Sequence, residues 1–296
     1  MSIFRLAHLS DPHLPPPPGA FGWRDLASKR LLSRIAWRRK HKIHRPEVLE
    51  ALVADLKAHA PDHVAITGDL TNFASPVEIA AATRWLQGLG PAETITVSPG
   101  NHDALVGETA QARFAPWTAW LGDDEQAAFP QVRLRGPVAL FNLCSALPTA
   151  LHLATGRLGA EQLEKLDALL ADPAFADRFK VVLLHHPPIA GAVSGRKSLD
   201  DQGPLRDVLA QRGVDLVLHG HAHESLTATI PGPGGRSIPV LGVPSASAWV
   251  GGHSPARWHA LEIEPREGGG FSLRVIARGL DPQTGGIREL GRYSLI

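Results

Sequence analysis

Five short apolar runs in this chain each end in a loop that carries aspartate, asparagine or histidine, and this repetition constrains the fold more than any other feature. The runs are rich in aliphatic and β-branched residues and stop near glycine or proline, which is typical of β-strands. In chain order they cover residues 3–9, 63–67, 94–98, 180–184 and 214–218. Ligands bind at the carboxyl ends of strands in open α/β sheets, so we expect the five loops to converge.

Segments with helical spacing of apolar residues separate these runs. Helices are predicted at 46–59, from Ser75-Pro76 to 86, at 159–170 and at 203–211, with a further strand at 138–143. From Ser225 onward the pattern changes to short strands joined by Pro and Gly turns. Because neither a repeat nor a linker interrupts the chain, we expect one α/β domain over residues 1–296, with a mainly β part at 225–296.

Composition excludes several classes of protein. Of the 296 residues, 44% are hydrophobic and 20% are charged, so the chain can bury a sizeable core and is not disordered. Cys144 is the only cysteine, which rules out an intramolecular disulfide framework and a multi-thiolate metal site. No apolar run approaches the roughly 18 residues of a membrane span, and the first residues lack the apolar core of a signal peptide. We therefore expect a cytoplasmic protein.

The five loops supply seven residues with oxygen or nitrogen atoms that bind metals. Residues i and i+2 of a strand-like segment face the same side, so we expect Asp11 to pair with His13 and His221 with His223. Two ions with four protein ligands each need eight contacts, and one bridging carboxylate reduces these to seven residues. Asp69 is the expected bridge, since it has two oxygens and no neighbouring ligand. The full set is Asp11, His13, Asp69, Asn101, His185, His221 and His223.

The donor types limit the metal. Imidazole, carboxylate and amide groups suit Mn, Fe, Zn or Co better than Ca or Cu(I), so two divalent ions of that group are the expected cofactors. Glycine precedes Asp69, Asn101 and His221, where it permits turns that other residues resist. Any one of these loops alone is more often a turn or a surface pair than a ligand set. Five in this order, all after predicted strands, indicate a metal centre.

The series Asp-x-His, Gly-Asp, Gly-Asn-His-Asp, His and Gly-His-x-His resembles that of the calcineurin-like metallophosphoesterases. It is most similar to the bacterial branch that contains class III cyclic-nucleotide phosphodiesterases and glycerophosphodiesterases, and it spans residues 9–223. The resemblance implies an α/β fold in the form of a four-layer α/β/β/α sandwich, in which helices flank two mixed β-sheets. It also implies a binuclear metal site at the strand ends.

Carried over by position, the resemblance divides the ligands between two ions. Metal 1 would be bound by Asp11, His13, Asp69 and His223, and metal 2 by Asp69, Asn101, His185 and His221. His185 is preferred to His186 because it directly follows its strand, as the ligand of the family does. Purple acid phosphatases of the superfamily place a tyrosine on the first iron. Because the only tyrosine here is Tyr293, and His13 stands in that position, we expect no ferric–tyrosinate site.

Hydrolysis of a phosphate ester needs a nucleophile, charge neutralisation and a protonated leaving group. Two divalent ions roughly 3.5–4 Å apart share a hydroxide and orient the phosphoryl oxygens for in-line attack. His102 lies beside a ligand, and we expect it to act as the general acid that protonates the leaving alkoxide. Asp103 is expected to assist as the second catalytic residue by fixing the tautomer of His102.

Residues 21–45, here called the cap segment, hold nine Lys or Arg and one acid, Asp25. The segment therefore carries +8, while the whole chain carries +1. Aromatic and aliphatic residues alternate with the basic ones, and two interpretations fit this pattern. The segment can be an ordinary cap helix with a solvated face. Alternatively, it can be a basic amphipathic helix that contacts either an anionic membrane surface or a phosphate-rich substrate. Nucleic acid is an unlikely partner, since the rest of the chain is acidic.

The sequence thus predicts a metallophosphoesterase that acts on a small phosphate ester, with a phosphodiester as the favoured substrate. The alternatives are a phosphomonoesterase, a phospholipid-head-group hydrolase peripheral to the inner membrane surface, or a catalytically weak binding or scaffold protein. A protein of the last kind is expected to have lost some site residues. Against it stand the intact Asp11, Asp69, Asn101, His102 and His221.

Overall fold

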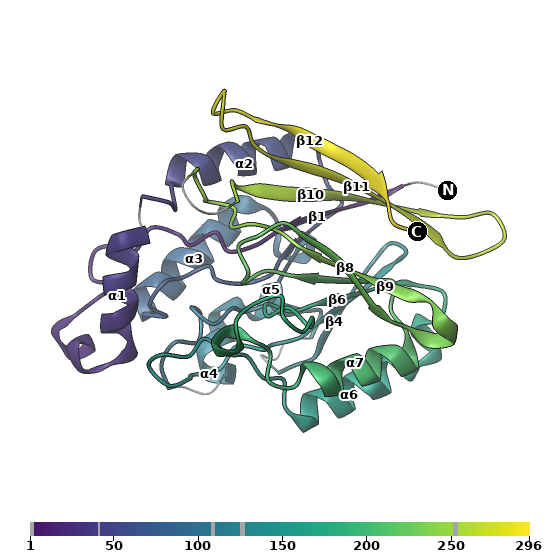
Figure 1. Ribbon diagram of the computed structural model, residues 1–296, viewed down its shortest axis with the longest axis horizontal. Helices are drawn as coiled ribbons and strands as arrows, with labels where there is room; N and C mark the ends of the chain where they lie inside the picture. Colours follow the sequence, from purple (N-terminus) through teal and green to yellow (C-terminus); the bar gives the residue numbers. More distant parts are fainter. Residues whose placement is uncertain (1–2, 41, 108–109, 125–127, 251–253) are drawn as a thin grey trace.

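The computed structural model describes residues 3–40, 42–107, 110–124, 128–250 and 254–296. Two six-stranded β-sheets pack face to face, and helices cover the outer face of each sheet (Figure 1). This is the four-layer α/β/β/α arrangement that the motif series implied, so the predicted fold class is confirmed.

The first sheet has the strand order β12-β11-β10-β1-β2-β3. Its parallel half is β1 (Phe4–Leu9), β2 (His63–Ile66) and β3 (Ile95–Val97). Its antiparallel half is β10 (Arg257–Pro265), β11 (Phe271–Leu280) and β12 (Ile287–Ser294). The last three strands are eight to ten residues long, so the prediction of only short strands after Ser225 was wrong for this part of the chain.

The second sheet has the order β4-β5-β6-β7-β9-β8. Four neighbouring strands run parallel: β5 (Val138–Asn142), β6 (Phe179–Leu183), β7 (Leu216–His219) and β9 (Ser237–Gly242). The edge strands β4 (Gln131–Arg135) and β8 (Leu226–Pro231) are antiparallel to their neighbours. The C-terminal strands are thus shared between the sheets, since β8 and β9 belong to the second and β10 to β12 to the first.

Strand β4 was not predicted, because its sequence carries two arginines. The buried Arg133 side chain donates hydrogen bonds to four backbone carbonyl oxygens, those of Ala92, Ile95, Ala119 and Gly122. These acceptors satisfy the two terminal nitrogens of the guanidinium, and Nε lies 3.5 Å from Oδ1 of Asp123, which provides the pairing that a buried charged group requires. A strand with a buried arginine therefore does not show the apolar pattern of a core strand.

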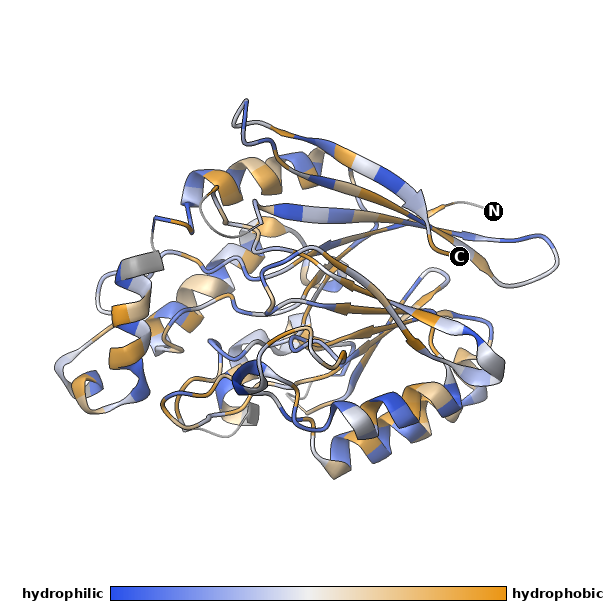
Figure 2. Cartoon of the chain, viewed as in Figure 1, coloured by the Kyte–Doolittle hydropathy of each residue, from blue (hydrophilic) through white to orange (hydrophobic). Residues whose placement is uncertain are grey.

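Apolar residues on opposite faces of the strands make three layers of core. Along β1, Leu6 faces the second sheet and Leu9 faces the helices. Helices α2 (Pro46–Ala58) and α3 (Pro76–Leu89) cover the first sheet, and α6 (Ala160–Ala171) and α7 (Gln202–Arg212) cover the second. Figure 2 shows hydrophobic residues along the strands of both sheets and a mixed surface on α6 and α7. Strands buried on both faces fit the nearly continuous apolar runs of the sequence.

Shorter helices connect these layers. The cap segment contains η1 (Trp23–Ala27) and α1 (Lys29–Lys40), which confirms the predicted helical stretch. Figure 1 shows α1 at the end of the sandwich where the parallel strands finish. The remaining short elements are η2 (Ala92–Thr94), α4 (Ala110–Phe114), η3 (Ala115–Trp117), α5 (Thr118–Leu121), η4 (Pro173–Phe175), η5 (Gly195–Lys197) and η6 (Pro233–Gly235).

Candidate metal centre

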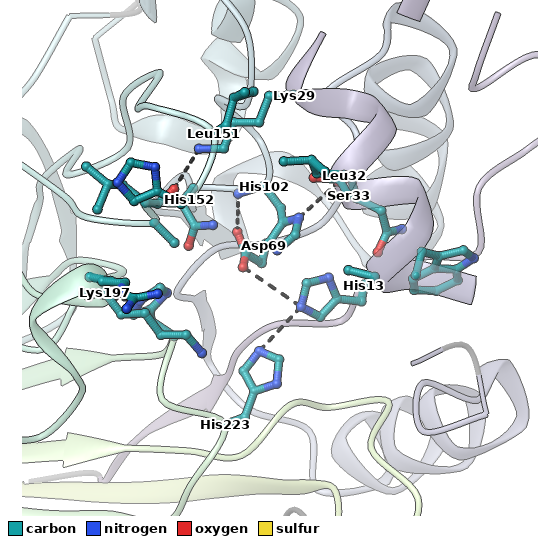
Figure 3. Close-up of a pocket in the computed structure, with 18 of the residues that line it drawn as sticks. His13, Lys29, Leu32, Ser33, Asp69, His102, Leu151, His152, Lys197 and His223 are labelled. Carbon is teal, nitrogen blue, oxygen red and sulfur yellow. Dashed lines mark hydrogen bonds and ion pairs between the residues drawn. The ribbon is translucent and has the colours of Figure 1, made fainter. Parts of the chain in front are cut away.

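The loops after β1, β2, β3, β6 and β7 meet at one edge of the sandwich, as the sequence predicted. A parallel bridge between Ser10 and Ser245 joins the end of β1 to the chain that follows β9. The loops form the floor of a cavity of about 620 Å³, and α1 forms part of its wall. Figure 3 shows His13, Asp69 and His223 turned toward one another in this cavity.

The first group of ligand atoms comes from Asp11, His13, Asp69 and His223. The Nε2 atom of His223 lies 3.0 Å from Oδ1 of Asp11 and 3.4 Å from Nε2 of His13. The Nε2 atom of His13 also lies 3.8 Å from Oδ2 of Asp69. Nitrogen and carboxylate atoms of four residues therefore face one point, which is the ligand set carried over for metal 1.

The second group is formed by Asp69, His185 and His221, with Asn101 beside them. The Nε2 atom of His185 lies 3.4 Å from Oδ2 of Asp69, 3.1 Å from Oδ1 of Asn101 and 3.2 Å from Nδ1 of His221. The other ring nitrogen of each histidine donates to a backbone carbonyl, from His185 to Thr67 and from His221 to Lys197. In the neutral imidazoles the facing nitrogens are then lone-pair atoms.

Four acceptor atoms that face one another at these distances repel unless a cation or a proton lies among them. Burial lowers the pKa of His185, but the Asp69 carboxylate outweighs it and raises the pKa to about 9. Burial holds the pKa of His221 well below its usual value, which keeps that ring neutral. The raised pKa of His185 indicates a demand for positive charge at this point, and the donor set fits a divalent transition-metal ion.

The two groups share one atom. Oδ2 of Asp69 faces His13 on one side and His185 on the other. Its partner oxygen, Oδ1, accepts a hydrogen bond of 2.7 Å from the backbone N–H of His102. Burial raises the pKa of Asp69, but the surrounding imidazoles of His185 and His102 bring it well below the usual value. The carboxylate is therefore ionised and oriented, with one oxygen directed at both groups.

The strand-like geometry expected for the pairs Asp11/His13 and His221/His223 was wrong. Asp11, His13, His221 and His223 do not have strand-like backbones, because their φ angles are 51°, 43°, 66° and 55°. Asp69 also lies in this left-handed region, at 54°. Such angles are uncommon for residues with a β-carbon, and strained conformations of this kind concentrate at functional sites. The ligands are therefore positioned by tight turns that follow the strands.

The glycines of the motifs act partly by close approach. Gly68 has a φ of 98°, so it makes the turn that was expected of it. A β-carbon at Gly100 would collide with Asp69, and one at Gly220 would collide with Ser10 and Asp11. These two glycines have no such φ angle, and their missing side chains instead let neighbouring ligand loops touch.

His102 lines the cavity, but its predicted contact with Asp103 is wrong. Nδ1 of His102 makes its hydrogen bond of 2.9 Å to the carbonyl oxygen of Asn72. The buried Asp103 carboxylate instead accepts hydrogen bonds from backbone N–H groups of Thr71 and Gly100, and from the Thr71 hydroxyl. Burial, followed by the nearby Asp69, raises the pKa of Asp103 to about 7. Asp103 thus ties two ligand loops together and leaves the orientation of His102 to Asn72.

The ring of His186 packs against His185 and His221, but its nitrogens contact other residues. Its Nδ1 lies 2.8 Å from the hydroxyl of Ser145, and its Nε2 lies 3.2 Å from the carbonyl oxygen of Ala154. Both ring nitrogens are occupied by these contacts, whereas His185 faces Asp69. The geometry agrees with the choice of His185 as the ligand.

Sequence reasoning missed two residues of the site. His44 lies in the cap segment, lines the cavity and packs against His13. Asn72 also lines the cavity and orients His102. Neither directly follows a predicted strand, and the only available signal for His44 was a histidine next to a basic helix and before Pro46.

The sequence model of the calcineurin-like phosphoesterase family matches residues 4–225. The chain belongs to this family. It is 31% identical over 220 residues to a probable cyclic nucleotide phosphodiesterase of Synechococcus, covering 73% of this chain and 77% of that protein. A second protein with the name probable cyclic nucleotide phosphodiesterase, from Rhodococcus erythropolis, is 30% identical over 233 residues, covering 77% of this chain and 67% of the relative.

Solved structures share the fold. A purple acid phosphatase from yellow lupin superposes with a TM-score of 0.59 at 14% identity, and the match covers 99% of this phosphoesterase but 53% of the lupin chain. A dimetal phosphatase from Danio rerio gives a TM-score of 0.53 at 11% identity over 98% of both chains. The phosphoesterase is thus a metal-binding hydrolase of phosphoester bonds. None of the helices in the described ranges has the length and apolar character that a membrane crossing requires.

Proposed function

We propose that this phosphoesterase hydrolyses phosphodiesters with two divalent ions held by the seven residues of the strand-end loops. The observation that carries the proposal is the position of Asp69 Oδ2, which faces one ligand group through His13 and the other through His185. When bound, such ions supply the Lewis acidity that activates the attacking water and neutralises the phosphoryl oxygens. Mn, Fe, Zn and Co all suit the nitrogen and oxygen donors.

His102 is proposed as the general acid. The carbonyl oxygen of Asn72 can only accept a hydrogen bond, so Nδ1 of His102 carries a proton and the ring is held in one orientation. Nε2 is then the atom that donates to the leaving alkoxide when it also carries a proton. The backbone N–H of the same residue orients Asp69. His102 thus contributes both the proposed proton donor, through its ring, and a hydrogen bond to the shared ligand Asp69, through its backbone.

The cavity walls favour a diester over a monoester. Beyond the ligands, the residues that line the cavity include the apolar Leu32, Trp37 and Leu151 and the basic Lys29 and Lys197. A diester has two organic substituents, so one can contact these walls while the phosphate lies over the ligands. The names of the Synechococcus and Rhodococcus relatives point to the same class of bond.

A metal-reconstituted substrate panel tests this function. The panel compares bis- and mono-nitrophenyl phosphates, cyclic nucleotides and glycerophosphodiesters, each with Mn, Fe, Zn or Co added to the metal-free protein. We expect the diesters to be hydrolysed with a higher kcat/KM than the monoester. A monoester preference with every metal would contradict the diester assignment, and no hydrolysis of any ester would contradict the enzymatic role.

A second candidate is a head-group hydrolase at an anionic membrane surface, and the exposed apolar residues of the cap segment favour it. Nine large hydrophobic residues are exposed in the described part of the chain. Four of them lie in the cap segment, namely Trp23 and Leu26 on η1 and Leu32 and Ile35 on α1. A fifth, Leu151, faces α1 across the cavity. Trp23 is 78% exposed and Leu151 is 60% exposed. Clustered exposed apolar residues mark interaction surfaces.

The charge of the cap segment contributes less to this surface than its sequence suggested. Arg30 is paired with Asp25 and donates to the carbonyl oxygens of Phe73 and Ala74, and Lys29 donates to Leu153. These two basic side chains fasten the segment to the body of the protein. Arg34 lies over the ring of Phe21, and Arg45 lies over the ring of Trp249. Arg38 and Lys42 are exposed, so both side chains are accessible to anionic lipid.

A further inference from the structure

His44 is a further imidazole at the metal centre, and it comes from outside the strand-end loops. It lies between α1 and α2, is buried and lines the cavity. Its ring centroid lies 4.5 Å from that of His13 and 5.7 Å from that of His223. It therefore packs against both histidines of the first ligand group. It does not belong to the second group, which contains Asp69, His185 and His221.

The surrounding chain holds this ring in place. The backbone N–H of Trp249 donates to the carbonyl oxygen of Ile43 at 2.7 Å, and that of Arg45 donates to Ser247 at 2.8 Å. Trp37 of α1 stacks on the ring, with an interplanar angle of 10° and a centroid distance of 5.9 Å. Fixed backbone on both sides and a stacked indole leave His44 little freedom, as a ligand position requires.

Two serine hydroxyls lie against Nδ1 of His44. The Ser245 hydroxyl has one hydrogen, and it donates that hydrogen to the backbone carbonyl of Asp11 at 2.6 Å. Toward Nδ1 of His44, 3.2 Å away, the same hydroxyl can only accept. The Ser247 hydroxyl lies 2.9 Å from the same nitrogen. When Nδ1 donates to Ser245, Nε2 of the neutral ring is a lone-pair atom, which is how metal-bound histidines are usually oriented.

His13, His44 and His223 each offer a ligand atom within 4.8 Å of those of the other two. Two nitrogens that each lie about 2.1 Å from one tetrahedral ion are about 3.4 Å apart. The Nε2 atoms of His13 and His223 already have this separation, and a movement of at most about 1.4 Å brings the ring of His44 to the same ion. We propose that His44 is an additional ligand of metal 1, which gives this site three imidazoles where the carried-over set has two. The inference rests on the proposed two-ion function.

Two consequences follow from a third imidazole at metal 1. Imidazole favours Zn, Fe and Co, whereas Mn prefers sites richer in carboxylate and carbonyl oxygen. Metal 1 would therefore discriminate against Mn more strongly than metal 2, whose set contains the Asn101 amide. In addition, His44 joins α1 to α2, so binding of metal 1 would fasten the cap segment over the cavity.

The test replaces His44 by phenylalanine, which keeps an aromatic ring beside Trp37 and removes both nitrogens. The metal-free full chain is titrated with Co²⁺, and the absorption spectrum and dissociation constants are recorded, followed by competition between Zn²⁺ and Mn²⁺. We expect H44F to weaken Co²⁺ and Zn²⁺ at one site by at least ~10-fold, to alter the d–d spectrum of that site, and to reduce the preference for Zn²⁺ over Mn²⁺. The other site should keep its affinity.

His152→Phe is the matched control, because His152 also lines the cavity but lies outside the three-histidine group. Its Co²⁺ spectrum should equal that of the wild type. Ser247→Ala keeps the imidazole and removes one hydrogen-bond partner, so it should shift the same site in the same direction by less, and it serves if H44F does not fold. Two Co²⁺ ions with wild-type spectra and affinities in both variants would overturn the role of His44 alone. Failure of the wild type to bind two ions would overturn the proposed function itself.

Discussion

The metal centre and the cap segment above it are built in opposite ways. The ligands of the centre follow core strands and are mostly buried. They lie in turns that are held by close contacts with neighbouring loops, such as that of Gly220 with Asp11. The cap segment is fastened mainly by long side chains such as Lys29 and Arg30, and it exposes Trp23 and Leu26. Rigid elements suit chemistry that tolerates little displacement, whereas adjustable surface elements suit recognition. In the proposed function, the floor carries the reaction, and the cap segment apart from His44 contacts the substrate.

The largest expected effect is that of Asp69→Ala at the centre of the floor. Because one carboxylate oxygen faces both ligand groups, its loss should release both ions and reduce hydrolysis to background. Metal content by elemental analysis and activity on a nitrophenyl diester measure the two effects. Asp167→Ala, at an exposed ion pair with Arg212, is the control and should keep full metal content. Two ions still bound to the Asp69 variant would contradict the shared-ligand assignment.

The division of the floor into two sites predicts selective losses. His223→Ala should deplete mainly metal 1, since its ring faces Asp11 and His13. Asn101→Ala should deplete mainly metal 2, since its amide faces His185. Each variant should bind about one ion tightly, and Co²⁺ spectra should differ between the two. If both variants lose both ions equally, the partition is wrong or the sites fill only cooperatively.

His102→Ala should leave the metals bound and slow the reaction in a way that depends on the leaving group. General acid catalysis contributes typically 10²–10⁴-fold, and it matters little when the leaving group is already a stable anion. We therefore expect a loss of about that size on an alkyl phosphodiester and a much smaller one on a nitrophenyl ester. Equal losses on both esters would instead assign His102 to substrate binding.

Acid should destabilise the sheets beneath the floor more than the cap segment. Burial lowers the pKa of His63 to about 3, so the folded protein keeps it neutral while the unfolded chain binds a proton below about 6.5. The unfolding free energy should therefore fall as pH drops from about 6.5 to about 3, by up to ~1.4 kcal/mol per pH unit for this group. Urea unfolding of His63→Gln should show a shallower fall between pH 7 and 5. His152→Gln, exposed on the loop that faces α1, should behave like the wild type.

The sequence predicted the floor better than the cap segment for a physical reason. The floor is specified by local signals, because each ligand directly follows an apolar run and strand ends of an α/β sheet converge. The turns themselves were not predicted, since the left-handed backbone of His13 and the contacts of Gly100 depend on other loops. His44 and the Asn72 carbonyl were missed because their roles arise only when distant segments meet. In the same way, nothing local shows that Arg30 is used up in fastening the cap segment.

The smallest expected effect concerns the exposed apolar face of the cap segment. If this face inserts into an anionic bilayer, replacing Trp23, Leu26 and Ile35 together by serine should reduce binding to vesicles that contain anionic lipid. Burial of one such side chain is worth roughly 1.5–3 kcal/mol, so even partial insertion predicts a loss of about tenfold or more. The matched control changes Val77 and Leu134, which are exposed apolar residues elsewhere on the molecule. Flotation of the full chain with neutral and anionic vesicles measures the effect.

Charge and insertion can then be separated in the same assay. Exposed Arg38 and Lys42 contribute an attraction that salt screens, because the Debye length falls from about 10 Å at 0.1 M to 3 Å at 1 M. Arg38→Glu with Lys42→Glu should therefore weaken binding at low salt and change little at high salt, whereas the serine variant should be weaker at both. Both variants should hydrolyse a small soluble diester at the wild-type rate, since none of these five side chains lines the cavity. If the wild type does not bind anionic vesicles even at low salt, the membrane-surface candidate is excluded. The cap segment would then select soluble esters, and the proposed reaction at the floor would be unaffected.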